Sequence, residues 1–229
     1  MAWEKSISLD SRLSSIAEML GSCDCCADIG SDHGRLGAFL VQNRRAQRVC
    51  LTDISAASLE KARRLVALTG LSAHVGFYVG DGARALEESV DAAVIAGMGG
   101  ETIAEIVEGA QGRLDGARLI LQPNVAAPEL RRRLNAAGWR IEDEALAKDG
   151  RRIYLVMRCA QGSQSLSERE IEVGPVLLEK RPPLLADYAR FRLRVAKAAL
   201  AGARAGADER SAMALEREIS IWEGVETCL

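Results

Sequence analysis

The segment Asp28–Gly34, with the sequence DIGSDHG, carries two carboxylates, a serine, a histidine and two glycines. It follows a short apolar run and precedes an apolar helical pattern. Glycines in such a loop let the backbone approach a ligand closely, and the helix N-terminus offers free N–H groups. The dinucleotide fingerprint G-x-G-x-x-G is absent, because three residues separate Gly30 from Gly34. An acid at the end of the preceding strand, Asp28, suits a cationic ligand better than a pyrophosphate.

Three further turns follow the next three predicted strands. Asp53 comes about 20 residues beyond the first loop, where an acid typically holds a ribose diol. Asp81 can accept a hydrogen bond from an adenine amino group, and the small residues around Met98 leave room beside a reactive methyl group. The carboxyl ends of neighbouring parallel strands open on one crevice, so the four turns predict a site for S-adenosyl-L-methionine (SAM), which carries an ammonium and a sulfonium but no phosphate. The expected cofactor-binding residues are Asp28, Gly30, Ser31, Gly34, Asp53, Ile54, Asp81, Gly82, Gly97, Met98 and Gly99. Taken singly, Asp53 and Asp81 are equally suited to capping helices.

These turns must be positioned by a sheet of alternating strands and helices. Strands are expected at 25–29, 48–52, 74–79, 91–96 and 118–122, and helices at 35–43, 56–69, 101–109 and 128–137. The strands are continuously apolar, which is typical of a parallel sheet covered on both faces. Two further strands, 139–147 and 152–158, flank an Asp-Gly turn and predict an antiparallel hairpin. The fold class is therefore α/β, with a Rossmann-like, mostly parallel sheet that ends in this hairpin.

A polar stretch at 161–165 reads as a linker. Beyond it, apolar residues at helical spacing predict two amphipathic helices that form a hairpin, with a break at 202–207. The expected seam is Leu184, Tyr188, Phe191, Val195 and Ala198 on the first helix and Ala212, Leu215, Ile219 and Trp222 on the second. The first helix is basic and the second acidic, so the two should attract each other. We therefore expect a methyltransferase domain at 1–160 and a helical hairpin domain at 161–229. The hairpin domain either covers the main core as a structural element or binds the substrate.

Composition places the chain among ordinary globular proteins. It has 229 residues, 30 Lys and Arg against 32 Asp and Glu, and a net charge of −2, which argues against an electrostatic nucleic-acid binder as a whole. No apolar run is long enough to span a bilayer and no signal peptide is evident, so we expect a cytoplasmic protein. We expect it to be a monomer or a weak homodimer. Cys23 and Cys26 form a CxxC pair, but no second pair follows, so we expect the six cysteines (23, 25, 26, 50, 159 and 228) to be structural and the protein to hold no metal.

The motifs together resemble the bacterial tRNA (adenine-22-N1)-methyltransferase family, over about 9–157. The segments that carry the resemblance are Asp28–Gly34, Thr52–Ile54, Gly80–Gly82, Gly97–Gly100, Gln122–Asn124 and Asp149–Tyr154. The family also has a C-terminal helical hairpin. The resemblance implies a class I methyltransferase fold, a tRNA substrate and methylation of an adenine in the D-loop region.

Adenine N1 carries its own lone pair, so methyl transfer to it needs alignment more than a general base. The expected catalytic residues are Asp32, which would stabilise the cationic product ring, His33, which would position the base, and Asn124, which would bond the adenine edge. Contacts to the methionine moiety or to the loop itself are equally open for Asp32 and His33, and a turn-stabilising role for Asn124. The Pro-Pro-aromatic clamp of exocyclic-amine methyltransferases is missing, so the residue that stacks on the base is not identified.

RNA contacts are expected from Arg151 and Arg152 beside the hairpin turn, and from Arg192 and Arg194 on the basic helix. Other basic candidates, such as Arg12 and the run 131–133, are equally suited to a solvated surface. The alternative function is a class I methyltransferase that acts on another RNA, a small molecule or a protein. A nicotinamide-dependent oxidoreductase is disfavoured by the missing fingerprint, and a non-catalytic RNA-binding module by the complete set of cofactor motifs.

Overall fold

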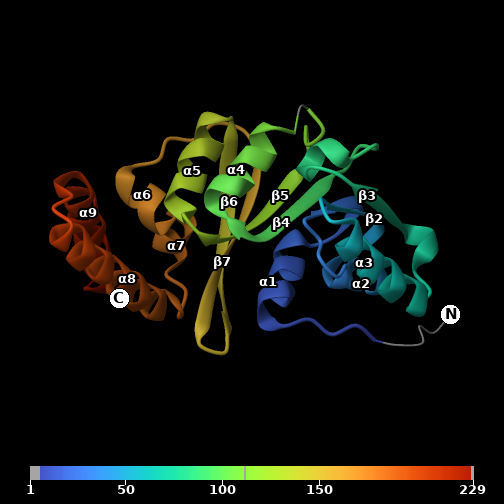
Figure 1. Cartoon of the computed structure of the whole chain (residues 1–229), viewed down its shortest axis with the longest axis horizontal. Coiled ribbons are helices and arrows are strands. Elements are labelled where there is room, and N and C mark those ends of the chain that lie inside the picture. Colours follow the sequence, from blue (N-terminus) through green and yellow to red (C-terminus); the bar gives the residue numbers. More distant parts are fainter. Residues whose placement is uncertain (1–5, 111, 228–229) are drawn as a thin grey trace. The chain divides into compact units, whose positions relative to one another are not determined.

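The computed structural model describes residues 6–110 and 112–227. The chain divides into two compact units, Met1–Ser165 and Leu166–Leu229, whose elements are labelled in Figure 1. The first unit holds every motif expected to bind the cofactor, and the second holds the helical hairpin. Cys228 lies outside the described residues.

The first unit is built on one seven-stranded sheet in the order β3-β2-β1-β4-β5-β7-β6. The strands are β1 (Cys23–Ile29), β2 (Ala46–Asp53), β3 (Val75–Val79), β4 (Ala92–Gly99), β5 (Arg118–Val125), β6 (Trp139–Asp149) and β7 (Arg152–Gln161). All neighbouring pairs are parallel except β5–β7 and β6–β7. The expected α/β class, with a mostly parallel sheet that ends in an antiparallel hairpin, is confirmed.

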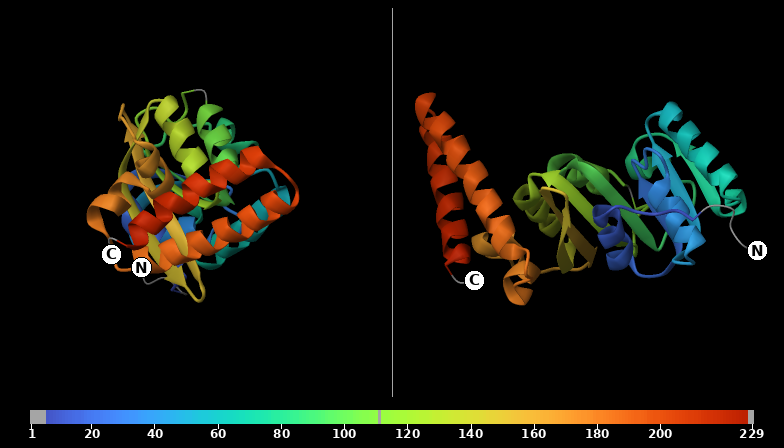
Figure 2. Two further views of the ribbon diagram at one scale, coloured as in Figure 1. Left: turned by 90° about the vertical axis from the view of Figure 1, so that its left-hand side faces the viewer. Right: turned by 90° about the horizontal axis from the view of Figure 1, so that it is seen from below.

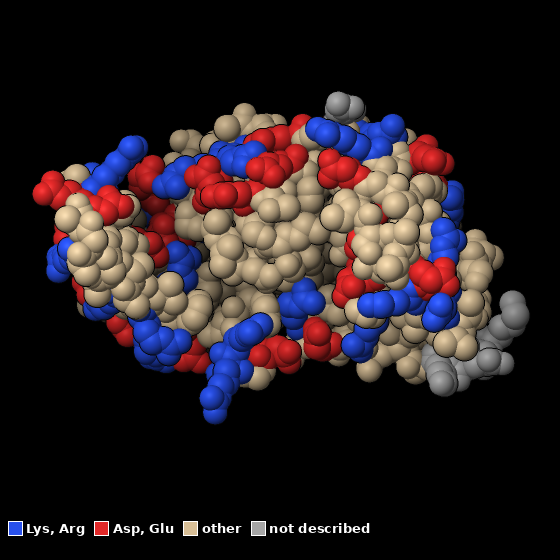
Figure 3. Space-filling model, viewed as in Figure 1, with Lys and Arg blue, Asp and Glu red and all other residues tan. Residues whose placement is uncertain are grey.

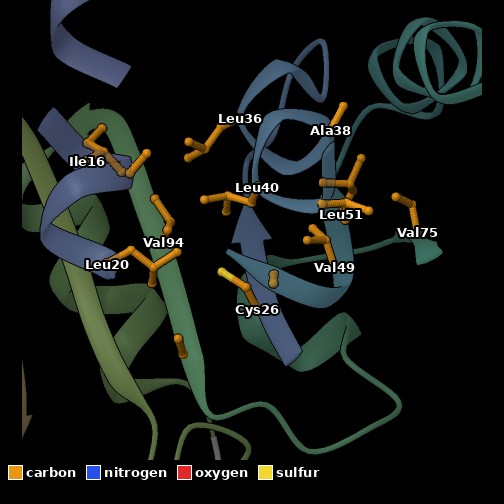
Figure 4. Close-up of a cluster of buried hydrophobic side chains, with 14 of the residues drawn as sticks. Ile16, Leu20, Cys26, Leu36, Ala38, Leu40, Val49, Leu51, Val75 and Val94 are labelled. Carbon is orange, nitrogen blue, oxygen red and sulfur yellow. The ribbon is translucent and has the colours of Figure 1, made fainter. Parts of the chain in front are cut away.

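Helices cover both faces of this sheet (Figure 1). They are α1 (Ser11–Leu20), α2 (Arg35–Gln42), α3 (Ala56–Leu68), α4 (Gly100–Glu108) and α5 (Ala127–Ala136), with short 3-10 turns at Ser72–His74 and Gly82–Ala85. The side chains of α1, α2 and α3 pack with those of the sheet in one core, which includes Ile16, Leu40 and Val94 (Figure 4). Burial of these apolar side chains holds β1 and its following loop in place.

The N-terminal helix α1 is an element that the sequence reading missed. Its apolar residues Ile16, Ala17 and Leu20 are buried at helical spacing. Asp10 caps it, since the carboxylate accepts a hydrogen bond from the backbone N–H of Leu13 at 2.8 Å. The first turn of α1 reaches the carboxyl edge of the sheet, where it contributes to the site described below.

Strands β4 and β5 are longer than expected. Met98 pairs with Pro123 and Gly99 with Val125, with irregular register on either side of Met98. The turn expected after residue 96 and the Gln-Pro-Asn segment therefore both belong to strands. The apolar pattern stops earlier because most of these last residues are glycine, proline or polar. Such a pattern predicts which side chains are buried but does not predict how the backbone pairs.

The second unit contains α6 (Glu168–Val173), α7 (Pro175–Lys180), α8 (Leu185–Ala205) and α9 (Glu209–Glu226). The helices α8 and α9 lie side by side (Figure 2). Ion pairs link them, Lys197 with Glu223 at 2.8 Å and Arg204 with Glu216 at 2.7 Å. The expected attraction between a basic and an acidic helix is confirmed. The break expected at 202–207 is present but begins later, because α8 continues to Ala205 and α9 begins at Glu209.

The expected seam on α8 is also partly wrong. Phe191 and Val195 are 41% and 47% exposed, whereas Leu193 and Ala196 are buried. Arg192 faces inward: its side chain is 16% exposed and bonds the carboxylates of Glu172 and Glu218, each at 2.8 Å. The prediction that Arg192 faces outward to contact RNA is therefore wrong. The inward face of α8 is itself apolar, with Leu185, Leu193 and Ala196 buried, but it is rotated relative to the expected seam and includes Arg192.

In the part of the chain that the structure describes, no helix is long and apolar enough to cross a membrane.

Candidate active site

The loop between β1 and α2 turns sharply at two glycines. Gly30 has φ +75°, and a side chain there would overlap the Met98 methyl group of β4. Gly34 has φ +66°, and a Cβ there would lie 2.7 Å from the Ala62 Cβ of α3. Only glycine combines a positive φ with the absence of a Cβ that these close approaches require. The close packing places the loop directly beside the end of β4.

Asp28 lies beneath this loop with 7% of its surface exposed. Burial raises the pKa of its carboxyl group to about 7, and the Gly37 backbone N–H and the nearby Arg12 guanidinium only partly offset that rise. The carboxylate is therefore poorly solvated, and an ammonium group would stabilise its charged form.

Asp53, at the end of β2, joins two loops through its carboxylate. Its Oδ1 accepts from the Ser55 N–H at 2.7 Å and its Oδ2 from the Asp32 N–H at 3.3 Å. Ser55, not Asp53, caps α3, since its hydroxyl accepts from the Ser58 N–H. The helix-capping explanation for Asp53 is therefore wrong, and the carboxylate instead sets the spacing between the first and second loops.

Asp81 stands at the N-cap of the Gly82–Ala85 turn, but its side chain makes no capping hydrogen bond. Its carboxylate is exposed and lies 3.5 Å from the Arg84 guanidinium. Capping thus does not account for this acid either. Asp53, Ile54, Asp81 and Gly82 all line one cavity of about 470 Å³, which α4 closes with Thr102, Glu105 and Ile106.

A second cavity of about 460 Å³ lies on the other side of the loop. It shares Gly30 and Met98 with the first cavity, so the two adjoin at these residues. Its walls include Asp28, Ser31, Asp32, His33 and Gly97 from the strand ends, and Asp10, Arg12 and Leu13 from α1. The buried Ser31 Oγ has no hydrogen-bond partner among the described residues, which is unusual unless a ligand supplies one.

Two exposed side chains on this loop form a close pair. The Asp32 Oδ2 lies 2.5 Å from the His33 Nδ1. The Asp32 backbone has φ +44°, a left-handed conformation that non-glycine residues rarely adopt. Such strain is often retained where a side chain must be aimed at a ligand.

A chain of hydrogen bonds orients Asn124 at the end of β5. Arg12 donates to the Gln122 Oε1 at 2.9 Å, and the Gln122 amide donates to the Asn124 Oδ1 at 3.1 Å. The Asn124 Nδ2 in turn donates to the Gly97 carbonyl at 2.7 Å. Both ends of the Asn124 amide are therefore held by neighbours, and Gly97 ties it to the second cavity.

Most of the residues expected from the sequence thus meet at two adjoining cavities. Gly34, Gly99 and Asn124 lie outside the cavity walls: Gly34 is a close-packed position, Gly99 is the N-cap residue of α4, and Asn124 lies beside Gly97. Sequence reasoning missed Thr102, Glu105 and Ile106, whose i, i+3, i+4 spacing at the start of α4 was the only signal. It also missed the part that α1 plays through Arg12.

Basic side chains gather over the tip of the β6–β7 hairpin (Figure 3). Lys148, Arg151 and Arg152 are all exposed there. On α8, the exposed Arg194 lies with its guanidinium carbon 5.6 Å from the centre of the Phe191 ring. Arg190 pairs with Asp187 of the same helix.

The cysteines lie away from these cavities. Cys23, Cys25, Cys26, Cys50 and Cys159 are free thiols. Within the described residues, one group of three side chains could hold a metal ion, Cys25, Cys50 and Glu88. The thiols lie 3.8 Å apart, and burial raises the pKa of both, which disfavours the thiolate form that binds metals.

The family model of the tRNA (adenine(22)-N(1))-methyltransferases, named TrmK, matches residues 26–223. The chain belongs to the TrmK family. A curated relative, the tRNA (adenine(22)-N(1))-methyltransferase of Bacillus subtilis, is 33% identical over 183 residues, which cover 76% of this chain and 77% of the relative. This TrmK chain is therefore a tRNA (adenine-N1)-methyltransferase.

Solved structures of similar proteins agree over nearly the whole chain. The B. subtilis TrmK crystal structure has a TM-score of 0.86 and 27% identity, covering 96% of this chain and 99% of that one. Streptococcus pneumoniae Sp1610 in complex with S-adenosyl-L-methionine also has a TM-score of 0.86, with 26% identity, covering 96% of this chain and all of that one. A Streptococcus agalactiae protein of the NADB-Rossmann superfamily has a TM-score of 0.88 and 26% identity, covering 96% of this chain and 98% of that one.

Proposed function

We propose that this TrmK protein transfers the methyl group of SAM to N1 of adenine 22 in tRNA, at the point where the two cavities adjoin. The observation that carries this proposal is the convergence of the strand-end acids and glycines on two cavities that share Gly30 and Met98. Together with the family, this arrangement supports a site that holds an elongated cofactor across the end of β1.

The residues present fit SAM at both ends. In the first cavity, Asp53 would hold the ribose hydroxyls and Asp81 the adenine amino group. In the second cavity, Asp28 would face the ammonium group, and the unpartnered Ser31 hydroxyl would bond the methionine moiety. Each cavity has the size of a typical small-molecule site. Gly30 provides the close backbone approach between them.

When bound, SAM supplies an electrophilic methyl group on a positively charged sulfur. The protein's task is to align adenine N1 with that methyl group, because in-line geometry accounts for most of the barrier that an enzyme can remove from such a step. N1 is unprotonated near neutral pH, so no residue must first remove a proton from it. We expect no metal ion to be needed.

Asp32 and His33 are placed to act on the base. With its proton on Nδ1, His33 donates to Asp32, which leaves Nε2 as an acceptor for a proton of the adenine 6-amino group. The Asp32 carboxylate would then stabilise the positive charge that N1-methylation creates on the ring. Both side chains line the second cavity.

Labelled SAM and tRNA transcripts test this proposal directly. Methyl incorporation into N1 of adenine 22, and its loss when that adenine is replaced by guanine, is the expected result; incorporation elsewhere would overturn the assignment. For Asp32→Asn, turnover should fall much more than cofactor affinity. An equal loss in both would mean that Asp32 instead holds the methionine end of the cofactor.

The tRNA-binding surface is proposed to include the hairpin tip with Arg151 and Arg152, because exposed guanidinium groups bind phosphates. Arg194 is a further candidate on α8. A tRNA substrate is consistent with a cytoplasmic enzyme, and we propose that it acts as a monomer or a weak homodimer. Size-exclusion chromatography with light scattering would test the latter.

A further inference from the structure

Adenine N1 lies on the Watson–Crick edge, so an enzyme that methylates it must take the base out of its pairing and stacking. Enzymes of this kind usually replace the lost stacking with an aromatic side chain. Among the described residues of the first unit, the aromatic side chains are Phe39, Phe77, Tyr78, Trp139 and Tyr154. Their places in the sheet distinguish them.

Three of these aromatic residues are occupied elsewhere. Phe39 and Phe77 pack against the hydrophobic core, and the Phe77 ring also lies 4.3 Å from the Arg63 guanidinium carbon. The Tyr78 hydroxyl donates to Glu88 at 2.7 Å.

The direction of the strands separates the remaining two. Trp139 is the first residue of β6, which runs parallel to β5, so it lies at the edge opposite the cofactor motifs. Tyr154 is the third residue of β7, which runs antiparallel to β5, so it lies at the same edge as those motifs. The last β5–β7 pair is Leu121 with Met157. Asn124 and Tyr154 each lie three residues beyond it.

Tyr154 is connected to the second cavity through Arg12. The Arg12 guanidinium carbon lies 5.8 Å from the centre of the Tyr154 ring. Arg12 itself lines the cavity and begins the hydrogen-bond chain that orients Asn124. The arginine that lies over the Tyr154 ring is therefore the one that reaches the Asn124 amide through Gln122, and that amide donates to the carbonyl of Gly97.

We propose that Tyr154 and Asn124 form the subsite for the flipped target adenine, with the Tyr154 ring stacked on the base. This inference rests on the proposed function and names the residues that recognise its purine substrate. The Asn124 Oδ1 accepts one hydrogen bond, from Gln122, and a carbonyl oxygen has two lone pairs. The second lone pair accepts from the adenine 6-amino group. Guanine presents an oxygen at that position, so the same amide rejects it.

Two substitutions at Tyr154 test the stacking role. Tyr154→Leu keeps an apolar side chain but removes the ring, and should lower kcat/KM for tRNA roughly 5- to 150-fold, the usual effect of losing one aromatic–base stack. Tyr154→Phe should retain activity within about threefold, because the ring and not the hydroxyl does the stacking. The matched control is Phe77→Leu, which removes a ring that also lies beside an arginine but lines neither cavity, and should leave kcat/KM unchanged.

A spectroscopic measurement separates stacking from a structural role. With 2-aminopurine in place of adenine 22, a fluorescent purine that keeps the stacking rings but lacks the 6-amino group, fluorescence of the wild-type complex should stay quenched by the Tyr154 ring, whereas the Tyr154→Leu complex should be severalfold brighter. Affinity for S-adenosyl-homocysteine should be the same in all variants. Equal brightness in both complexes, or a Phe variant as impaired as the Leu variant, would overturn the stacking assignment. A wild-type enzyme that methylates no adenine of tRNA would instead overturn the proposed function.

Discussion

The buried carboxyl group of Asp28 lowers the free energy of unfolding at neutral pH, and this cost can be measured. Its pKa rises from 3.8 to about 7 because burial removes water from the charged form. The folded state therefore keeps a proton that the unfolded chain has already released, so its stability falls as pH rises from about 4 to 7. The full loss is about 4 kcal/mol, at 1.36 kcal/mol for each unit of pKa shift.

Replacing Asp28 with Asn removes this cost, because the amide is neutral at every pH and its oxygen can still accept from the Gly37 N–H. Between pH 5 and pH 8, the stability of Asp28→Asn relative to the wild type should rise by about 2.7 kcal/mol, since two units of the shift lie in that interval. For a unit of this size, the relative melting temperature should rise by about 5–10 °C. Scanning calorimetry of the free protein at both pH values measures this, and it resolves the unfolding of the two units.

The decisive quantity is the change in relative stability between pH 5 and pH 8, because any packing change caused by the amide affects both measurements equally. Asp81→Asn is the control, since that carboxylate is 76% exposed and stays in water in both states. A relative stability of Asp28→Asn that is the same at pH 5 and pH 8 would refute the reasoning. If Asp28 also faces the cofactor ammonium, wild-type SAM affinity should increase with rising pH, by up to about tenfold for each pH unit below pH 7, because only the charged carboxylate attracts the ammonium. The Asn variant should lose that dependence.

Three further variants test other parts of the molecule. Asp53→Ala should weaken binding of S-adenosyl-homocysteine by about 1.5–3 kcal/mol through loss of charge-assisted bonds to the ribose, and calorimetry that finds unchanged affinity would remove that assignment. Arg151→Glu with Arg152→Glu should lower tRNA affinity and make it less sensitive to salt, because fewer phosphate-bound ions are released; an unchanged salt dependence would exclude the hairpin tip from the interface. Arg192→Met should destabilise the second unit by roughly 3 kcal/mol, because it removes the cation that bonds two inward carboxylates, while cofactor affinity stays unchanged; an unaltered melting temperature of that unit would contradict the inward ion pairs.

Residues whose role follows from chain order were predictable from the sequence. Asp53 and Asp81 were placed correctly because the carboxyl ends of parallel strands must meet at one edge of the sheet, whatever the details of packing. The antiparallel hairpin followed in the same way from one Asp-Gly turn between two apolar runs. The attraction between α8 and α9 followed from their opposite charges.

Features that depend on contacts between distant segments were decided only by the tertiary structure. Arg12 and Gln122 are 110 residues apart in the chain, and no local pattern indicates that they would orient Asn124. The raised pKa of Asp28 and the lone hydroxyl of Ser31 likewise depend on what the fold places around them. Arg192 shows the same limit in reverse: helical spacing fits two neighbouring faces of α8, and only the packed structure shows that the buried face includes Arg192, with Glu172 and Glu218 of other helices as its partners. Local spacing records which residues share a face or a strand end, whereas burial and partners are properties of the assembled chain.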